Sequence, residues 1–174
     1  EFDKVKEKLL GDIEVNTTAK NEHVGEIERK IRHVKERCRC ITADIPYDVL
    51  PNRMIKALVI HAVMLLNCYP DKQGVSEEYS PRELVLRWQL SAKHLQHQFG
   101  AYGLAYDDPS TTNTQQVRGI EAICLGPTGN MQGTYKFLSL STGRIVKRRK
   151  FDEYPIPDSI IKKVNSMGRR DHKN

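Results

Sequence analysis

Residues 120–151 read IEAICLGPTGNMQGTYKFLSLSTGRIVKRRKF, and this stretch decides the fold of the second half of the chain. Two turn sequences, Pro127-Thr-Gly-Asn130 and Ser141-Thr-Gly-Arg144, divide it, and glycine in such short connections is typical of hairpins. The apolar runs that remain are Ile120–Leu125, Thr134–Leu140 and Ile145–Phe151. The stretch therefore predicts a three-stranded meander with short loops.

The last of these runs carries a cluster of positive charge. Alternate residues of a strand share a face, so Lys147 and Arg149 are predicted on the face of Ile145 and Phe151. The other face carries Val146, Arg148 and Lys150. A strand charged on both faces cannot be central in a sheet, so we expect an edge strand. Its cations either protect the edge from aggregation or contact nucleic acid, and the sequence leaves both interpretations open.

A helix with apolar residues on nearly every side is predicted from Pro51 to Cys68. Such a pattern is typical of a helix buried on most of its sides. His61 lies within it, and we interpret His61 as a satisfied core histidine, with a ligand role as the alternative. The apolar positions are Ile55, Leu58, Val59, Ala62, Val63, Leu65 and Leu66.

Another helix begins at Ser80-Pro-Arg-Glu83, which is a capping-box sequence with proline at the first helical position. We expect Leu84, Val85 and Trp88 of this helix to face inward. After Gln98 the sequence predicts short strands punctuated by glycine. A flexible connector is predicted over residues 106–116.

The two ends of the chain have weaker patterns. Residues 2–10 are a candidate for a short amphipathic helix, and residues 12–18 for a loop or a short edge strand. Near the other end, Asp158 and Ser159 are predicted to cap a short helix that extends through Val164. A basic, disordered tail is expected after it.

Upstream, the segment NEHVGEIERKIRHVKER, residues 21–37, predicts an amphipathic helix with Asn21 as its N-cap, broken at residues 44–48. An apolar stripe at helical spacing comprises Val24, Ile27, Ile31, Val34 and Cys38. At roughly 100° per residue, Glu28 falls about a quarter-turn from the stripe, on the flank that also carries Arg32, Lys35 and Arg39. We therefore expect Glu28 at the rim of a buried face, beside cations.

Two interpretations of Glu28 are open. A carboxylate in this position can ligate a hard cation such as Mg²⁺ while its basic neighbours hold phosphates. Alternatively, Glu28 and Arg32, like Glu26 and Lys30, are ordinary pairs four residues apart on a solvated helix.

Composition limits the class of protein. A chain of 174 residues with 39% hydrophobic content can bury one good core, or one core and a small satellite domain. Because no apolar run approaches the roughly 18 residues of a membrane span and no signal peptide opens the chain, we expect a soluble protein. The chain begins with Glu1 rather than Met, so we expect an excerpt of a longer one.

The cysteines do not have the spacing of a zinc site. Cys38 and Cys40 would point to nearly opposite sides of one helix, and Cys68 and Cys124 lie far away in sequence. We expect free thiols in a reducing compartment.

Positive charge is concentrated in two places. Residues 111–174 contain 12 Lys and Arg against 5 Asp and Glu, whereas residues 1–110 contain 16 against 17. Within that first part, residues 29–39 still hold six basic residues and one acid. Two separate basic surfaces suggest a polyanionic partner that spans both.

The order of the motifs resembles the C-terminal half of the integrase core of copia-type LTR retrotransposons. In chain order the motifs are Gly25-x-x-Glu28-Arg29, Leu50-Pro51, Asn67-x-x-Pro70, Ser80-Pro-x-Glu-Leu84 and Phe99-Gly100. A second series resembles the small Src-homology-3-like barrel that follows this core in the Pol polyprotein: Leu125-Gly126, Gly133-x-Tyr135-x-Phe137, Ser141-Thr-Gly143, Ile145-Val146 and residues 149–153. The resemblance covers residues 15–157.

The resemblance implies a metal-dependent chemistry for the parent protein. In such integrases, two Asp and one Glu of a ribonuclease-H-like fold bind two divalent ions, which activate a DNA 3′-hydroxyl for attack on a phosphodiester. Glu28 matches the family's Glu and is therefore the candidate catalytic residue and metal ligand, whereas neither Asp has a match in this chain. Mg²⁺ or Mn²⁺ is expected in the complete integrase, with no ion tightly bound to this chain.

We thus expect an α+β chain in three parts. Residues 1–97 would be the helical C-terminal part of a ribonuclease-H-like core, residues 98–157 a small Src-homology-3-like β-barrel, and residues 158–174 a short helix and basic tail. The candidate nucleic-acid-binding residues are Arg32, Lys35, Arg39, Lys147, Arg148, Arg149 and Lys150.

The expected function is that of an integrase fragment that binds nucleic acid and is inactive by itself. Its implied partners are the DNA of the element ends and target, the rest of the integrase or Pol polyprotein and further copies of itself, in the nucleus and without a membrane. The alternative is a non-catalytic basic module that tethers a partner protein or RNA. Two Asp in strand-like contexts immediately upstream would favour the enzyme.

Overall fold

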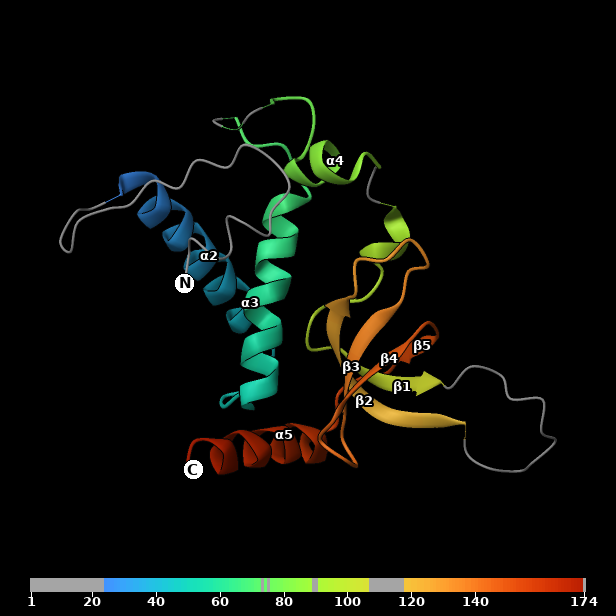
Figure 1. Ribbon diagram of the computed structural model, residues 1–174. Coiled ribbons are helices and arrows are strands. Elements are labelled where there is room, and N and C mark those ends of the chain that lie inside the picture. Colours follow the sequence, from blue (N-terminus) through green and yellow to red (C-terminus); the bar gives the residue numbers. More distant parts are fainter. Residues whose placement is uncertain (1–23, 73, 75, 89–90, 107–117, 174) are drawn as a thin grey trace, which may run out of the picture. The chain divides into compact units, whose positions relative to one another are not determined.

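The computed structural model describes residues 24–72, 74, 76–88, 91–106 and 118–173. The chain divides into two compact units, residues 1–33 and 34–174. In chain order the elements are α2 (Gly25–Asp44), α3 (Asn52–Asn67), α4 (Pro81–Leu86), the 3₁₀ turn η1 (Ala92–His94), β1 (Tyr102–Tyr106), β2 (Gly119–Pro127), β3 (Tyr135–Ser139), β4 (Ile145–Arg148), β5 (Phe151–Glu153) and α5 (Asp158–Asp171) (Figure 1). These helices and strands confirm the predicted α+β class.

Several predicted features lie outside the described residues. These are the helix over residues 2–10, the segment 12–18, the N-cap Asn21 and the connector over residues 106–116 except Tyr106, which ends β1.

The five strands form one antiparallel sheet in the order β4-β3-β2-β1-β5. Strands β2, β3 and β4 are the predicted meander, and their short connections make each strand pair with the next. The register of β2 and β3 shifts between Cys124 and Pro127, where Gly126 has a φ of +92°. A Cβ atom on Gly126 would also collide with the ring of His61, so this bulge requires glycine.

The expectation of one strand from Ile145 to Phe151 is wrong. Strand β4 ends at Arg148 and pairs with β3, whereas β5 begins at Phe151 and pairs with β1 at the opposite edge. Phe151 is buried in the cluster against which Val146 packs, although strict alternation would put these two side chains on opposite faces. The chain therefore turns at residues 149 and 150, and that turn lets Phe151 reach the core.

The sheet is strongly curved. Strands β3 and β5 are separated by β2 and β1, so in a flat sheet they would lie about 14 Å apart, at about 4.8 Å per strand. The rings of Phe137 on β3 and Phe151 on β5 nevertheless have centroids 4.6 Å apart. These rings belong to a small cluster to which every strand contributes: Ala105, Ala122, Cys124, Tyr135, Phe137 and Phe151, with Val146 packed against it.

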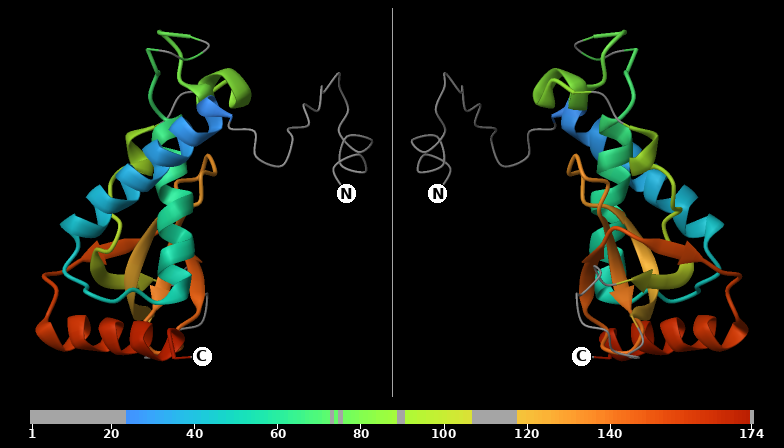
Figure 2. Two further views of the ribbon diagram at one scale, coloured as in Figure 1. Left: turned by 90° about the vertical axis from the view of Figure 1, so that its left-hand side faces the viewer. Right: turned by 90° about the vertical axis from the view of Figure 1, so that its right-hand side faces the viewer.

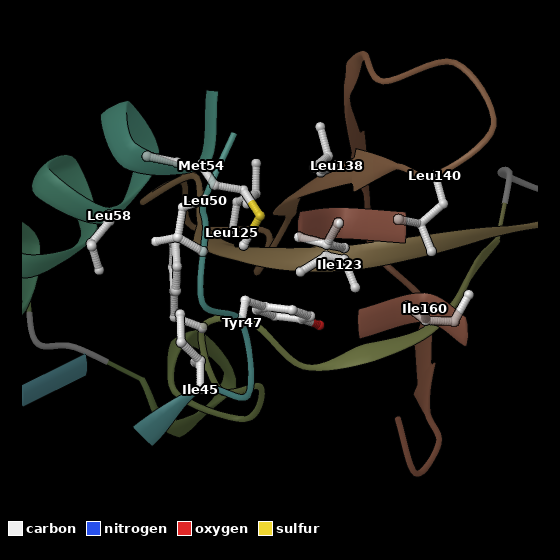
Figure 3. Close-up of a cluster of buried hydrophobic side chains, with 13 residues drawn as sticks. Ile45, Tyr47, Leu50, Met54, Leu58, Ile123, Leu125, Leu138, Leu140 and Ile160 are labelled. Atoms are coloured by element: carbon white, nitrogen blue, oxygen red, sulfur yellow. The ribbon is translucent and has the colours of Figure 1, made fainter. Parts of the chain in front are cut away.

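The larger core lies between α3, the other face of the sheet and α5 (Figure 3). Met54 of α3, Ile123 of β2 and Leu138 of β3 are completely buried in it. Tyr47, in the connection before α3, donates a hydrogen bond of 3.0 Å from its hydroxyl to the carbonyl of Gly100. This core joins residues on both sides of the predicted boundary between residues 97 and 98, and that division into domains stays a prediction.

Helix α3 begins and ends within a residue of its predicted bounds, but it is not buried on most sides. Its buried residues are Met54, Ala57, Leu58 and Ala62, which form one stripe. Ile60 is 59% exposed and Val59 is 44% exposed on the remaining surface. An all-round apolar sequence here produces a one-sided contact with the sheet and leaves an apolar face uncovered by the described residues.

The capping box at Ser80 is confirmed, because the Ser80 hydroxyl accepts from the Glu83 amide and the Glu83 carboxylate accepts from the Ser80 amide. Helix α4 is nevertheless only six residues long and ends where Arg87 adopts a left-handed φ of 55°. Leu84 and Val85 are exposed, so the expectation that they face inward is wrong.

Helix α5 is longer than predicted and continues through the expected disordered tail to Asp171. It lies beside the sheet at the N-terminal end of α3 (Figures 1 and 2). Asn165 accepts from the amide of Val49 at 3.1 Å, and Asp171 accepts from the amide of Asn52 at 2.9 Å. The N-cap of α5 is Pro157, and Asp158 is the first helical residue, so the prediction that Asp158 caps the helix is wrong. The hydrogen bonds of Asn165 and Asp171 come from the second half of α5. These contacts hold the last turns of the helix in place.

Candidate nucleic-acid interface

Helix α2 carries the first group of predicted site residues. Glu28, Arg32, Lys35 and Arg39 follow one another at spacings of four, three and four residues, so they lie along one flank of the helix, and all four side chains are exposed. Glu28 and Arg32 belong to the unit of residues 1–33, and Lys35 and Arg39 to the unit of residues 34–174.

The apolar stripe of α2 is buried only toward its C-terminal end. Cys38 and Ile41 pack against the larger core, but Ile27 is 58% and Ile31 is 48% exposed. Glu28 therefore does not lie at the rim of a buried face in the described structure, and that expectation is wrong. The physical reason is that the described residues supply no apolar surface to cover the first turns of the helix.

The second group lies on β4 and on the turn that follows it. Lys147 and Arg149 are exposed, whereas Arg148 is half-buried and donates to the carbonyl of Lys147 at 2.9 Å. The ammonium of Lys150 lies 5.0 Å from the centre of the Tyr106 ring, within the range of a cation–π contact. The expectation that Arg148 and Lys150 share a face does not apply, because the strand ends between them.

Sequence reasoning missed one cation of this surface. Lys136 of β3 lies directly opposite Lys147 of β4 in the register, so the two side chains are on the same face of the sheet. The sequence could have indicated this, because Lys136 lies between Tyr135 and Phe137 and must face the opposite side of the strand from these two buried residues. Placing Lys136 beside Lys147 also required the register of the hairpin, which the turn sequence alone did not supply.

His61 is half-buried, and its Nδ1 atom is buried with no hydrogen-bond partner among the described residues, so the interpretation of His61 as a satisfied core histidine is wrong. Burial lowers the pKa of His61, whose ring stacks on Phe99 with centroids 5.4 Å apart. Burial raises the pKa of Cys124 to about 12, so this thiol is protonated and unreactive at neutral pH. The four cysteines are all free.

Neither a metal cluster nor a membrane helix is found in the described part of the chain. No group of three His, Cys, Asp or Glu side chains is arranged there to hold a metal ion. No helix formed by these residues is both long and apolar enough to cross a membrane.

Comparisons with protein-family models, with curated proteins and with solved structures find no match to this chain. Any function assigned to it rests on its own residues and on their arrangement.

Proposed function

We propose that this chain is part of an integrase of the copia retrotransposon type, and that it binds nucleic acid and does not catalyse strand transfer by itself. In this proposal Glu28 supplies one of three metal ligands, Mg²⁺ or Mn²⁺ is bound only by the complete protein, and the chain works in the nucleus with the rest of the Pol polyprotein.

The sheet supports the proposal of a Src-homology-3-like barrel. Five short antiparallel strands in the order β4-β3-β2-β1-β5, curved so that residues of both edge strands meet one cluster, are what such a barrel requires. The turn at residues 149 and 150 moves the chain from one edge of the sheet to the other.

The helices support the proposal of an incomplete ribonuclease-H-like core. Ile27 and Ile31 on α2, and Val59 and Ile60 on α3, are apolar residues that the described structure leaves exposed. Exposed apolar helix faces mark contacts with further protein, and in this proposal that protein is the remainder of the core.

The observation that carries nucleic-acid binding is the pair Lys136 and Lys147. Like charges directly opposite each other on neighbouring strands destabilise a sheet, and a bound anion would offset that repulsion. Arg149, in the turn that follows β4, is also exposed. The phosphates of a DNA backbone are such anions, and their binding depends on counterion release.

A salt titration of binding to a labelled duplex of about 20 base pairs tests the proposal. We expect a dissociation constant on the order of micromolar at physiological salt. Replacing Lys147, Arg149 and Lys150 by Gln should flatten the slope of log affinity against log salt by about 0.9 for each phosphate that the variant no longer neutralises. The matched control replaces Lys162, Lys163 and Arg169 of α5, which removes the same charge elsewhere.

An unchanged slope in the strand variant would contradict the proposal. The cations would then serve only to protect the edge of the sheet. The exposed apolar face of α3 favours the second candidate, a tethering module that docks a partner protein. For that candidate, Val59→Asp would weaken partner binding without changing the salt slope.

A further inference from the structure

A pocket of about 210 Å³ lies between α3 and strands β2, β3 and β4. Most of its wall is apolar and includes Ile60 and Met64 of α3, Leu125 and Pro127 of β2, and Ile145 of β4. His61 of α3 also lines the pocket. We call it the α3–sheet pocket. Pockets for drug-sized ligands occupy about 300–1,000 Å³, so this one suits a single flat group rather than a whole cofactor.

Four cations surround the α3–sheet pocket: Arg53, Lys56, Arg82 and Lys136. No acidic side chain is among the described residues that line it. None of these four cations forms an ion pair with another described residue. The pocket therefore combines largely apolar walls with a rim of cations for which the described residues supply no acidic partner.

Of the four cations, Arg82 gives the strongest argument for a bound anion. Its guanidinium donates to the carbonyl of Gly129 at 2.8 Å and lies 4.6 Å from the centre of the Trp88 ring. Its Nε atom is buried, with no hydrogen-bond partner among the described residues. A half-buried cation that is held in place without a counter-charge is costly, and a bound anion would remove that cost.

The row of charge continues out of the pocket. Lys136 lies at the pocket and is paired across the strands with Lys147, which Arg149 follows two residues later. A single phosphate on a peptide would need only the cations of the rim. Cations that continue from the pocket to Lys147, with Arg149 exposed in the turn after β4, suit a chain of phosphates, which is a property of nucleic acid strands.

We propose that the α3–sheet pocket takes one unpaired base of a nucleic acid strand, with the adjoining phosphate held by the rim cations and the rest of the strand following Lys147 and Arg149. The base would lie between aliphatic side chains, as extruded bases do in protein pockets. This inference rests on the proposed nucleic-acid binding and adds to it a preference for an unpaired end.

Two duplexes test the inference, one blunt and one with a single-stranded 3′ extension of two nucleotides, measured by fluorescence anisotropy. We expect the extended duplex to bind about tenfold more tightly, because an accommodated base adds to the phosphate contacts. Ile60→Asp, which puts a carboxylate at the pocket, should abolish this difference. The matched control is Val59→Asp, a neighbouring exposed residue of the same helix that does not line the pocket.

Equal affinity of the native chain for the two duplexes would overturn the inference, and so would an equal loss of preference in the two variants. A third measurement uses adenosine monophosphate and inorganic phosphate as competitors. Adenosine monophosphate should displace the extended duplex at a lower concentration, and equal competition by phosphate would overturn a site for the base. Binding of the blunt duplex that did not depend on salt would contradict the proposed nucleic-acid binding itself. Failure of the proposed function and failure of the base pocket therefore give different results.

Discussion

At the scale of single residues, His61 links the folded state to pH. Burial lowers its pKa below the ordinary value of 6.5, so the unfolded chain binds a proton that the folded chain excludes. Stability is then lost as the pH falls through about 6.5, and the loss is complete below the folded-state pKa. We expect His61→Gln to flatten this dependence in urea unfolding between pH 5 and 8. His33→Gln, on the exposed surface of α2, is the matched control.

A second prediction concerns the capping box. Ser80 is buried and accepts from the amide of Glu83 at 3.2 Å, and its own amide lowers the pKa of Glu83 by donating to that carboxylate. Ser80→Ala should lower the free energy of unfolding by about 1 kcal/mol, the usual value of an N-cap. Ser166→Ala, at an exposed position of α5, is the control in the same denaturant series. Equal stabilities of the two variants would show that α4 is held by packing alone.

At the scale of elements, α5 is fixed by close contact. Gly168 lies against the backbone of Val49, and a Cβ atom there would collide with the Val49 carbonyl. Gly168→Ala should therefore destabilise the protein by about 1–3 kcal/mol, despite the higher helix propensity of alanine. Gly25→Ala is the matched control, because nothing lies within 4 Å of the added atom. Thermal unfolding distinguishes the two variants, and a stabilised Gly168→Ala would contradict this packing.

The sequence predicted those elements whose signals are local. The capping box, the bounds of α3 and the pairing of consecutive strands in the meander depend on neighbouring residues, and the structure confirms them. The end of β4, the exposed face of α3 and the full length of α5 depend on contacts between residues far apart in the chain. Periodicity cannot report such contacts, because it shows that a face is apolar without showing what covers it.

The same limit applies to the candidate interface. The cations of β4 form a run that is visible in the sequence, but Lys136 joins them only through the register, and Arg53 and Arg82 approach Lys136 only through the packing of helices on the sheet. The partner of this surface, like the role of Glu28, stays a prediction.

At the scale of the whole molecule, a single candidate carboxylate limits the chemistry. We expect calorimetric titration of this chain with Mg²⁺ to show no tight binding. Mg²⁺ sites usually combine one or two carboxylates with substrate phosphates, whereas Glu28 would act alone and without phosphates. The positive charges of Arg32 and Lys35 on the same flank also repel a cation. A dissociation constant in the low micromolar range would show that further ligands complete the site.

The role of Glu28 can be tested in a longer chain that carries two upstream Asp residues. There, Glu28→Gln should abolish strand transfer and leave the affinity for DNA nearly unchanged, because it removes a metal ligand from an exposed position. Glu26→Gln, two residues away, should retain strand transfer. Equal effects of the two substitutions on strand transfer would contradict the assignment of the catalytic acid.

The docking of α5 has a consequence for synthesis. The amide of Val49 bonds to a side chain 116 residues later in the chain, and the amide of Asn52 to one 119 residues later. Translation adds about 5–20 residues per second, so a ribosome needs roughly 6–24 s to deliver the partners of these two amides. During that interval Ile160 and Val164 are also missing from the larger core. The nascent chain must therefore keep the surface of α3 from aggregating until α5 emerges, which makes chaperone binding to this segment most valuable during translation.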